Sequence, residues 1–339
     1  MTRRPTLLVV SALLLFLPAG MALAQTTISP APGPIYRLTP RSGFEEGCFD
    51  PCLCIAHFSD ALIGTWRMTP GAPDPRFRVY DITDVNWFLP GLDLRVTGKG
   101  TYRIGGEFAL MHQLALDLVV GDRPVQHFDS GLVLGGAEFP EINLTISINN
   151  MVCHDTVFHV SAAPVPLKEI VPYLLQGSSY DEGCYGPCDC AIVSRPLIGR
   201  FGLLQLRATD TGIDYAVLNI RWAVRDANTP TVSSVSSVNG FGVYLTRAAT
   251  AVDAAGSTQR MVLDLIEGGK GPTRFDSGVV PAGAPGDGRF TLRVDIDVAE
   301  NGFACYDNVY SIHAKRRVAT VTSGVVSPEP KPIDVKPAP

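Results

Sequence analysis

We predict an all-β protein with two tandem homologous domains, each a β-sandwich or a small β-barrel stapled by disulfides. Three features support this prediction: a cysteine motif that occurs twice, apolar residues that alternate with polar ones, and frequent turn residues. Many short strands separated by Gly, Pro, Asn and Asp favour a sandwich or a barrel. After residue 24 no convincing amphipathic helix is found.

The first 24 residues have the three parts of a secretory signal peptide. Arg3-Arg4 is a basic start, residues 7–17 are almost wholly apolar, and Ala22-Leu23-Ala24 is a small-x-small cleavage site. This stretch is too short for a membrane span, and no later stretch approaches the ~20 apolar residues that a span needs. We therefore expect a secreted or periplasmic protein, in a compartment where thiols oxidise.

The rest of the chain divides by composition and by its internal repeat. The sequence predicts a leader at 25–34, a first β domain at 35–163, a linker at 164–171, a second β domain at 172–317 and a Pro-rich disordered tail at 318–339. Apolar residues make up 46% and charged residues 18%, as in a folded globule. The net charge of −5 gives no support for nucleic-acid binding, which needs a basic surface.

The period of two is clearest at Ile142–Ile148 and Phe290–Val298, and it recurs at Leu114–Leu118 and Met261–Leu265. Further strands are expected at Ile63–Met68, Phe77–Trp87, Leu94–Thr97, Thr101–Ile104 and Cys153–Val160. This predicts about seven or eight strands in each domain.

The repeated motif is Glu46-Gly47-Cys48-Phe49-Asp50-Pro51-Cys52-Leu53-Cys54, which returns as Glu182-Gly183-Cys184-Tyr185-Gly186-Pro187-Cys188-Asp189-Cys190. With one distant cysteine for each copy, the predicted disulfide residues are Cys48, Cys52, Cys54, Cys153, Cys184, Cys188, Cys190 and Cys305. A bond between Cys52 and Cys54 would be strained in extended chain. We therefore expect Cys153 to pair with Cys52 or Cys54, and Cys48 with the other.

Metal binding is the main alternative for the cysteines. Three close thiolates and one distant thiolate could hold zinc or copper(I). Structural zinc sites favour two pairs of ligands, however, and export favours oxidation, so disulfides are preferred. His154 would add a ligand beside Cys153, but Tyr306 stands at that place in the second copy. We predict no metal and no cofactor.

Two matched segments, Phe128-Asp129-Ser130-Gly131 and Phe275-Asp276-Ser277-Gly278, carry a further alternative. This pattern resembles the aspartic peptidases, which place Asp-Thr/Ser-Gly in each of two lobes. The resemblance implies that Asp129 and Asp276 form a catalytic dyad. It is incomplete, because Leu132 and Val279 follow where that family usually has a small or hydroxyl residue. The other interpretation is an Asp-Ser-Gly turn between two strands.

Matched acids and aromatic residues leave two smaller questions. The pairs Asp117 with Asp264, Asp129 with Asp276 and Asp155 with Asp307 could serve calcium, although no calcium-loop spacing is present. Trp66 matches Phe201 and Trp87 matches Trp222, and such residues on strands are more often core than a sugar platform. We expect an exported, non-enzymatic binding or surface protein with an unknown protein or glycan ligand and no catalytic residue. Metal handling and an aspartic-peptidase-like hydrolase are the alternatives.

Overall fold

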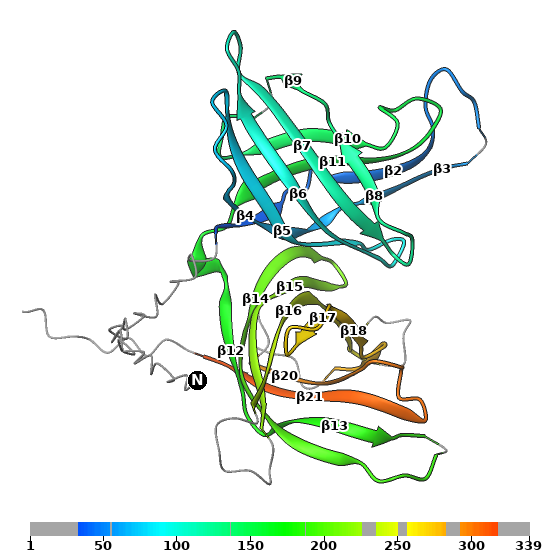
Figure 1. The fold of residues 1–339 in the computed structure, drawn as a ribbon. Coiled ribbons are helices and arrows are strands. Elements are labelled where there is room, and N and C mark those ends of the chain that lie inside the picture. The colour runs from blue at the N-terminus through cyan, green and yellow to red at the C-terminus, as the bar shows by residue number, and fades with distance from the viewer. Residues whose placement is uncertain are drawn as a thin grey trace, which may run out of the picture. The chain divides into compact units, whose positions relative to one another are not determined.

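The computed structural model describes residues 33–54, 56–135, 137–186, 188–225, 235–249, 256–282 and 292–317. Within these residues the chain is almost entirely β, and a short 3₁₀ turn at Leu167–Glu169 is the one helical element. The predicted all-β class is confirmed, with two similar sheets (Figure 1). The predicted signal peptide, most of the leader and the predicted tail lie outside the described residues.

The first sheet contains eleven strands. They are β1 (Ile35–Leu38), β2 (Gly43–Cys48), β3 (His57–Ala61), β4 (Ile63–Pro70), β5 (Phe77–Leu89), β6 (Leu94–Gly105), β7 (Met111–Val120), β8 (Gln126–Asp129), β9 (Val133–Leu134), β10 (Ile142–Ser147) and β11 (His154–Pro164). The second sheet contains ten strands. They are β12 (Val171–Leu175), β13 (Ser178–Cys184), β14 (Val193–Thr209), β15 (Gly212–Arg225), β16 (Val235–Arg247), β17 (Thr258–Glu267), β18 (Thr273–Asp276), β19 (Val280–Pro281), β20 (Arg293–Ala299) and β21 (Tyr306–Arg316).

Each sheet closes on itself. In the first, neighbouring strands pair in the order β1, β4, β5, β6, β7, β8, β10 and β11, and β11 pairs back to β1. The second has the order β12, β14, β15, β16, β17, β18, β20 and β21, with β21 pairing back to β12. A β-sandwich and a small β-barrel were the two expected architectures, and this ring of paired strands has the closure of a barrel. Closure leaves fewer unpaired strand edges than an open sheet has.

One junction in each ring is much narrower than the others. Strand β8 meets β10 through the single residue pair Asp129 and Ser147. Strand β18 meets β20 through the single pair Asp276 and Ala299. The other strand pairs of each ring join through at least three residue pairs. We call this junction the seam of each sheet.

Alternating side chains fill the interior of each ring. In the first sheet Leu114, Leu116 and Leu118 on β7 are fully buried, and they pack with Trp66 and Trp87. The second sheet has Met261, Leu263 and Leu265 at the matched positions. Both interiors are therefore built from the period of two that the sequence shows.

Outward-facing residues of the two sheets also pack together, within one compact unit that begins at Gly33. One apolar cluster joins Ile63 and Phe88 to Val243, Leu245 and Val262. Arg95 of the first sheet is 4% exposed, and its guanidinium donates to the Asp264 carboxylate of the second sheet at 2.5 Å. The contact between the sheets therefore contains a buried ion pair as well as apolar surface.

The strand expectations need two corrections. The sequence predicts about seven or eight strands per domain, whereas the sheets have eleven and ten because the rings carry additional hairpin strands. The separate strands expected at Leu94–Thr97 and Thr101–Ile104 are one strand, β6, since Gly98 and Gly100 continue its pairing with β7. A cross-strand backbone lies very close to each glycine, so a Cβ at Gly100 would be 2.1 Å from the Ala115 carbonyl oxygen.

Candidate functional site

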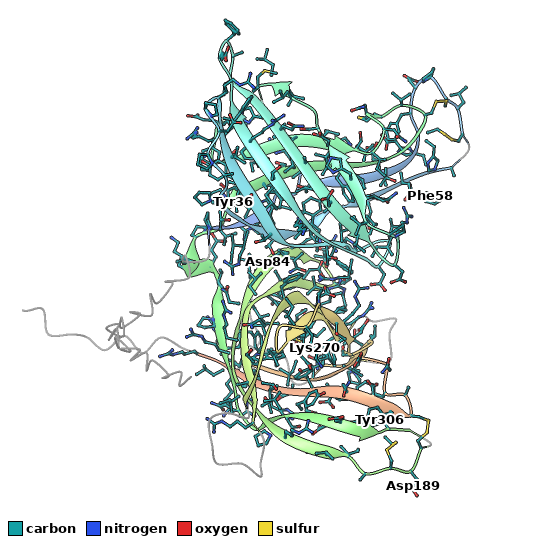
Figure 2. The ribbon with its side chains drawn as sticks, in the orientation of Figure 1. Tyr36, Phe58, Asp84, Asp189, Lys270 and Tyr306 are labelled. Carbon is teal, nitrogen blue, oxygen red and sulfur yellow. A yellow bond between two sulfur atoms is a disulfide. The ribbon has the colours of Figure 1, made fainter. Side chains whose placement is uncertain are left out.

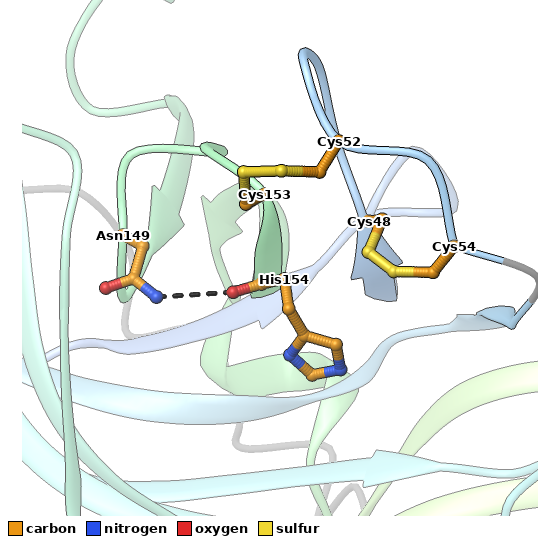
Figure 3. Close-up of a disulfide and its surroundings, with 6 residues drawn as sticks. All are labelled: Cys48, Cys52, Cys54, Asn149, Cys153 and His154. Carbon is orange, nitrogen blue, oxygen red and sulfur yellow. Dashed lines mark hydrogen bonds between the residues drawn. A yellow bond between two sulfur atoms is a disulfide. The ribbon is translucent and has the colours of Figure 1, made fainter.

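The cysteine motifs lie at one end of each sheet, and all eight cysteines form disulfides. Of the pairings left open by the sequence, the first sheet has Cys48–Cys54 and Cys52–Cys153 (Figure 3). The second sheet repeats this pattern with Cys184–Cys190 and Cys188–Cys305. Asp189, between two of these cysteines, is at the outer end of the second sheet (Figure 2).

Sulfur in a disulfide is not a thiolate, so these clusters hold no metal ligand in this oxidised state. No cluster of three potential ligands is found anywhere in the described part of the chain. The candidate ligand His154 uses its backbone carbonyl to accept from the Asn149 amide at 3.2 Å. Metal binding would therefore require reduction of the bonds first.

The Phe-Asp-Ser-Gly segments form identical turns at the two seams. The Asp129 carboxylate accepts from the Gly131 amide at 2.8 Å, and the Ser130 hydroxyl accepts from the Leu114 amide at 3.0 Å. At the second seam, Asp276 accepts from Gly278 at 2.8 Å and Ser277 from Met261 at 2.9 Å. Both glycines have φ 62°, a left-handed conformation that favours glycine.

The structure does not bring Asp129 and Asp276 together. The Asp129 carboxylate accepts two bonds from the Gln113 amide at 2.7 Å, within the first sheet. The Asp276 carboxylate accepts from the Arg260 guanidinium at 2.6 and 3.0 Å, within the second. These hydrogen bonds to Asp276 raise the pKa of Arg260 above its usual value. The hydrogen bonds of the described residues include none between the two carboxyl groups, and a shared proton needs one.

The other matched acids also have structural partners. Asp155 is buried and accepts from four backbone amides, those of Ile148, Asn149, Met151 and Thr156, at 2.7 to 3.1 Å. Asp307 does the same with the amides of Asn301, Phe303 and Asn308 at 2.7 to 2.9 Å. Each carboxylate shapes the loop next to the long-range disulfide. These oxygens are occupied by amide donors, which argues against a calcium site there.

The matched aromatic residues are core, as expected. Trp66, Trp87, Phe201 and Trp222 are each 3% exposed or less. In the first sheet the Trp66 and Trp87 rings meet edge to face, with centroids 5.7 Å apart. They pack the interiors of the closed sheets, so they form no exposed platform for sugar rings.

A pair of matched β-bulges forms the more informative feature. Strand β5 has a register shift against β6 between Ile82 and Val85, where Asp84 has φ 52°. Strand β15 has the same irregularity against β16 between Val217 and Ile220, where Asn219 has φ 54°. Asp and Asn tolerate this left-handed conformation better than other residues with a side chain. Strained backbone of this kind is often found at functional sites.

Both bulges line one cleft of ≈ 320 Å³ between the sheets, which we call the bulge cleft. Arg67 connects them: its Nε donates to the Asp84 carboxylate at 3.1 Å, and its other nitrogens donate to the Asn219 side-chain oxygen and the Gly33 carbonyl. The Arg67 side chain is only 17% exposed, whereas the Asp84 side chain is 47% exposed. The cleft therefore has a fixed, hydrogen-bonded floor.

The far wall of the bulge cleft is contributed by the second sheet. Arg221 donates from its guanidinium to the Asn239 side-chain oxygen at 2.7 Å, and Phe241 and Ile266 add apolar surface. A guanidinium has five N–H donors, and the bond to Asn239 uses one of those of Arg221. Among the ion pairs of the described residues, none includes Arg221.

Comparison with protein families, with curated proteins and with solved structures finds no match. In the described residues, no helix has the length and apolar character that would let it cross a membrane. The residues of the bulge cleft must therefore be interpreted from their own geometry.

Sequence reasoning missed the bulge cleft. A usable signal was present, because Asp84 lies between Tyr80 and Trp87 at the place where Asn219 lies between Tyr215 and Trp222. A residue that disfavours strands, at the same place in two matched strands, indicates a bulge. That both bulges line a single cleft depends on the packing of the sheets, for which the sequence has no local signal.

Proposed function

We propose that this chain is an exported, non-enzymatic binding protein and that its ligand occupies the bulge cleft. The observation that carries the proposal is that the Arg67 guanidinium donates to the side chains of both matched bulge residues, Asp84 and Asn219. A concave site with a few fixed polar groups and apolar walls is the usual form of a ligand site. The described residues that line the cleft include no nucleophile paired with a base, and so binding is the chemistry that this geometry supports best.

Export is the second part of the proposal. Four disulfides in one chain are typical of proteins that fold in an oxidising compartment. The signal-like first 24 residues support the same location. Expression with these residues intact should place the mature chain in the periplasm or the medium, with mass spectrometry showing cleavage before Gln25. Retention of the uncleaved chain in the cytoplasm would contradict export.

The binding proposal can be tested with two glycine variants. Asn219→Gly removes an amide from the cleft and keeps the left-handed backbone, and Asn150→Gly does the same at φ 54° in a loop of the first sheet outside the cleft lining. Glycans, small molecules and peptides are screened for thermal stabilisation of the wild-type protein. A ligand at 100 times its Kd should stabilise the folded chain by about 2.7 kcal/mol.

The ligand should stabilise wild type and Asn150→Gly, and it should stabilise Asn219→Gly much less. Equal stabilisation of all three proteins would place the ligand elsewhere and remove the cleft from the proposal. A screen that is negative in all three classes would contradict the binding function itself.

A further inference from the structure

A row of residues in register crosses the outer face of the second sheet. Its members, strand by strand, are Arg293, Lys315, Leu174, Arg200, Arg221, Asn239 and Ile266. Their neighbours along the strands, such as Phe201 and Trp222, belong to the interior core, so the row faces outward. Four members are arginine or lysine and none is acidic. We call these four residues, Arg293, Lys315, Arg200 and Arg221, the basic row.

Within the described residues, no ion pair neutralises the basic row. All four cations are exposed. Arg200 lies directly opposite Arg221, and like charges on facing positions of neighbouring strands are destabilising. The nearest carboxylate along β20, Asp295, contacts His313 at 3.2 Å.

The first sheet supplies an internal comparison. Asn86 and Arg221 each precede a matched tryptophan, so the corresponding row contains Ala163, Arg37, Thr65, Asn86, Thr97 and Val119. That row has one cation, Arg37, which forms an ion pair with Glu169 at 2.8 Å. Of these two matched rows, the one in the second sheet carries the positive charge without ion pairs, in a chain with a net charge of −5.

We infer that the basic row binds an acidic polysaccharide, a polymer with one carboxylate on each sugar unit. The inference rests on the proposed function only in taking the chain as an exported binding protein. Positive side chains opposite a line of carboxylates provide charge complementarity, and arginine can bind a carboxylate through two parallel hydrogen bonds.

The geometry of the row favours a flexible polymer over a flat surface. Neighbouring strands are about 4.8 Å apart, so the five strands from β20 to β15 span about 19 Å of surface. The sheet is closed, so a row that crosses its strands curves around the ring. A planar membrane touches only part of such a row, whereas a flexible chain can follow it. Each sugar unit of a polyuronate carries one carboxylate, so negative charge recurs regularly along the polymer, as the cations recur from strand to strand along the row.

Titration calorimetry with oligomers of a uronic acid tests the inference on the full mature chain. Neutral glucose oligomers of equal length are the ligand control. The test variant is Arg200→Gln with Lys315→Gln, neither of which lines the bulge cleft. The matched control is Arg37→Gln with Lys99→Gln, which removes the same charge from the first sheet.

Uronate oligomers should bind wild type and the control variant, and the test variant should lose about two- to thirtyfold in affinity, since it lacks two exposed contacts of about 0.2–1 kcal/mol each. Binding should also weaken with added salt, because salt screens exposed charges. Equal affinity in the test and control variants would overturn the inference. Equal or tighter binding of polyglutamate or of anionic vesicles would overturn the choice of polysaccharide. Asn219→Gly leaves the basic row intact, so the test of ligand binding in the bulge cleft and the test of uronate binding at the basic row can fail independently of each other.

Discussion

Asp117 in the first sheet and Asp264 in the second occupy matched positions on β7 and β17, and they have opposite environments. Asp117 is 52% exposed and forms an ion pair with the exposed His127, at 2.7 Å. Asp264 is 9% exposed and lies between Arg95 at 2.5 Å and Arg274 at 3.4 Å. The seam turns and the disulfides, in contrast, are nearly identical in the two sheets. The internal framework has been kept in both copies, while the outward residues have taken different roles.

The largest effect should come from the long-range disulfides. Replacing Cys52 and Cys153 with serine opens a loop with a sequence separation of 101, and the chain-entropy treatment gives a loss of roughly 4–5 kcal/mol. Replacing Cys48 and Cys54, which are separated by 6, should cost only about 2 kcal/mol. Urea unfolding of the two double variants measures the difference. Equal losses would mean that the two bonds are not distinguished by loop length.

The different environments of Asp117 and Asp264 are tested by two alanine variants. Asp264→Ala leaves the Arg95 guanidinium buried without its carboxylate, which should lower the free energy of unfolding by about 3–5 kcal/mol. Burial already lowers the pKa of Arg95, and Asp264 opposes that shift. Asp117→Ala removes an exposed contact and should cost less than about 1 kcal/mol. Similar losses in both variants would refute the buried role of Asp264.

High pH should destabilise the protein through its interior tyrosines. Burial raises the pKa of Tyr36 to about 12, and burial also raises the pKa of Tyr102, Tyr215 and Tyr310. The folded chain then keeps protons that the unfolded chain releases above pH ~10, so stability falls by up to about 1.4 kcal/mol per pH unit for each such tyrosine. Tyrosinate absorbance, followed together with unfolding, should show these residues ionising only as the sheets open. Ionisation of all ten tyrosines near their usual pKa in the folded protein would contradict this.

The smallest effect concerns one polar pair inside the second sheet. The Tyr310 hydroxyl donates to Glu267, whereas the first sheet has Phe158 and Val120 at those places. Tyr310→Phe should lower the free energy of unfolding by about 1 kcal/mol, because Glu267 loses its donor. Phe158→Tyr should also destabilise, since Val120 offers no acceptor. Calorimetry measures the free energy of unfolding of both variants and so checks whether each substitution destabilises the sheet in which it is made.

The sequence was most informative where the period of two and the repeat act together. Strands β7 and β17 were predicted from three alternating apolar residues each, and the cysteine pairing was narrowed to two alternatives. Register was not predictable, because the alignment of Arg200 with Arg221 depends on which strands pair and on the bulge between Arg200 and Gly202. For the same reason the Arg95–Asp264 ion pair could not be predicted from the sequence, in which the two residues are 169 positions apart.

The seam has a mechanical consequence. Since β8 and β10 share one residue pair, and β18 and β20 share one, little backbone bonding must be lost for either ring to part there. The amide protons of β8 and β18 that face β10 and β20 should accordingly exchange with solvent earlier than those along β6 or β16. The duplicated Asp-Ser-Gly turn lies at this weak junction in both sheets, and its hydrogen bonds would then help to keep each ring of strands closed.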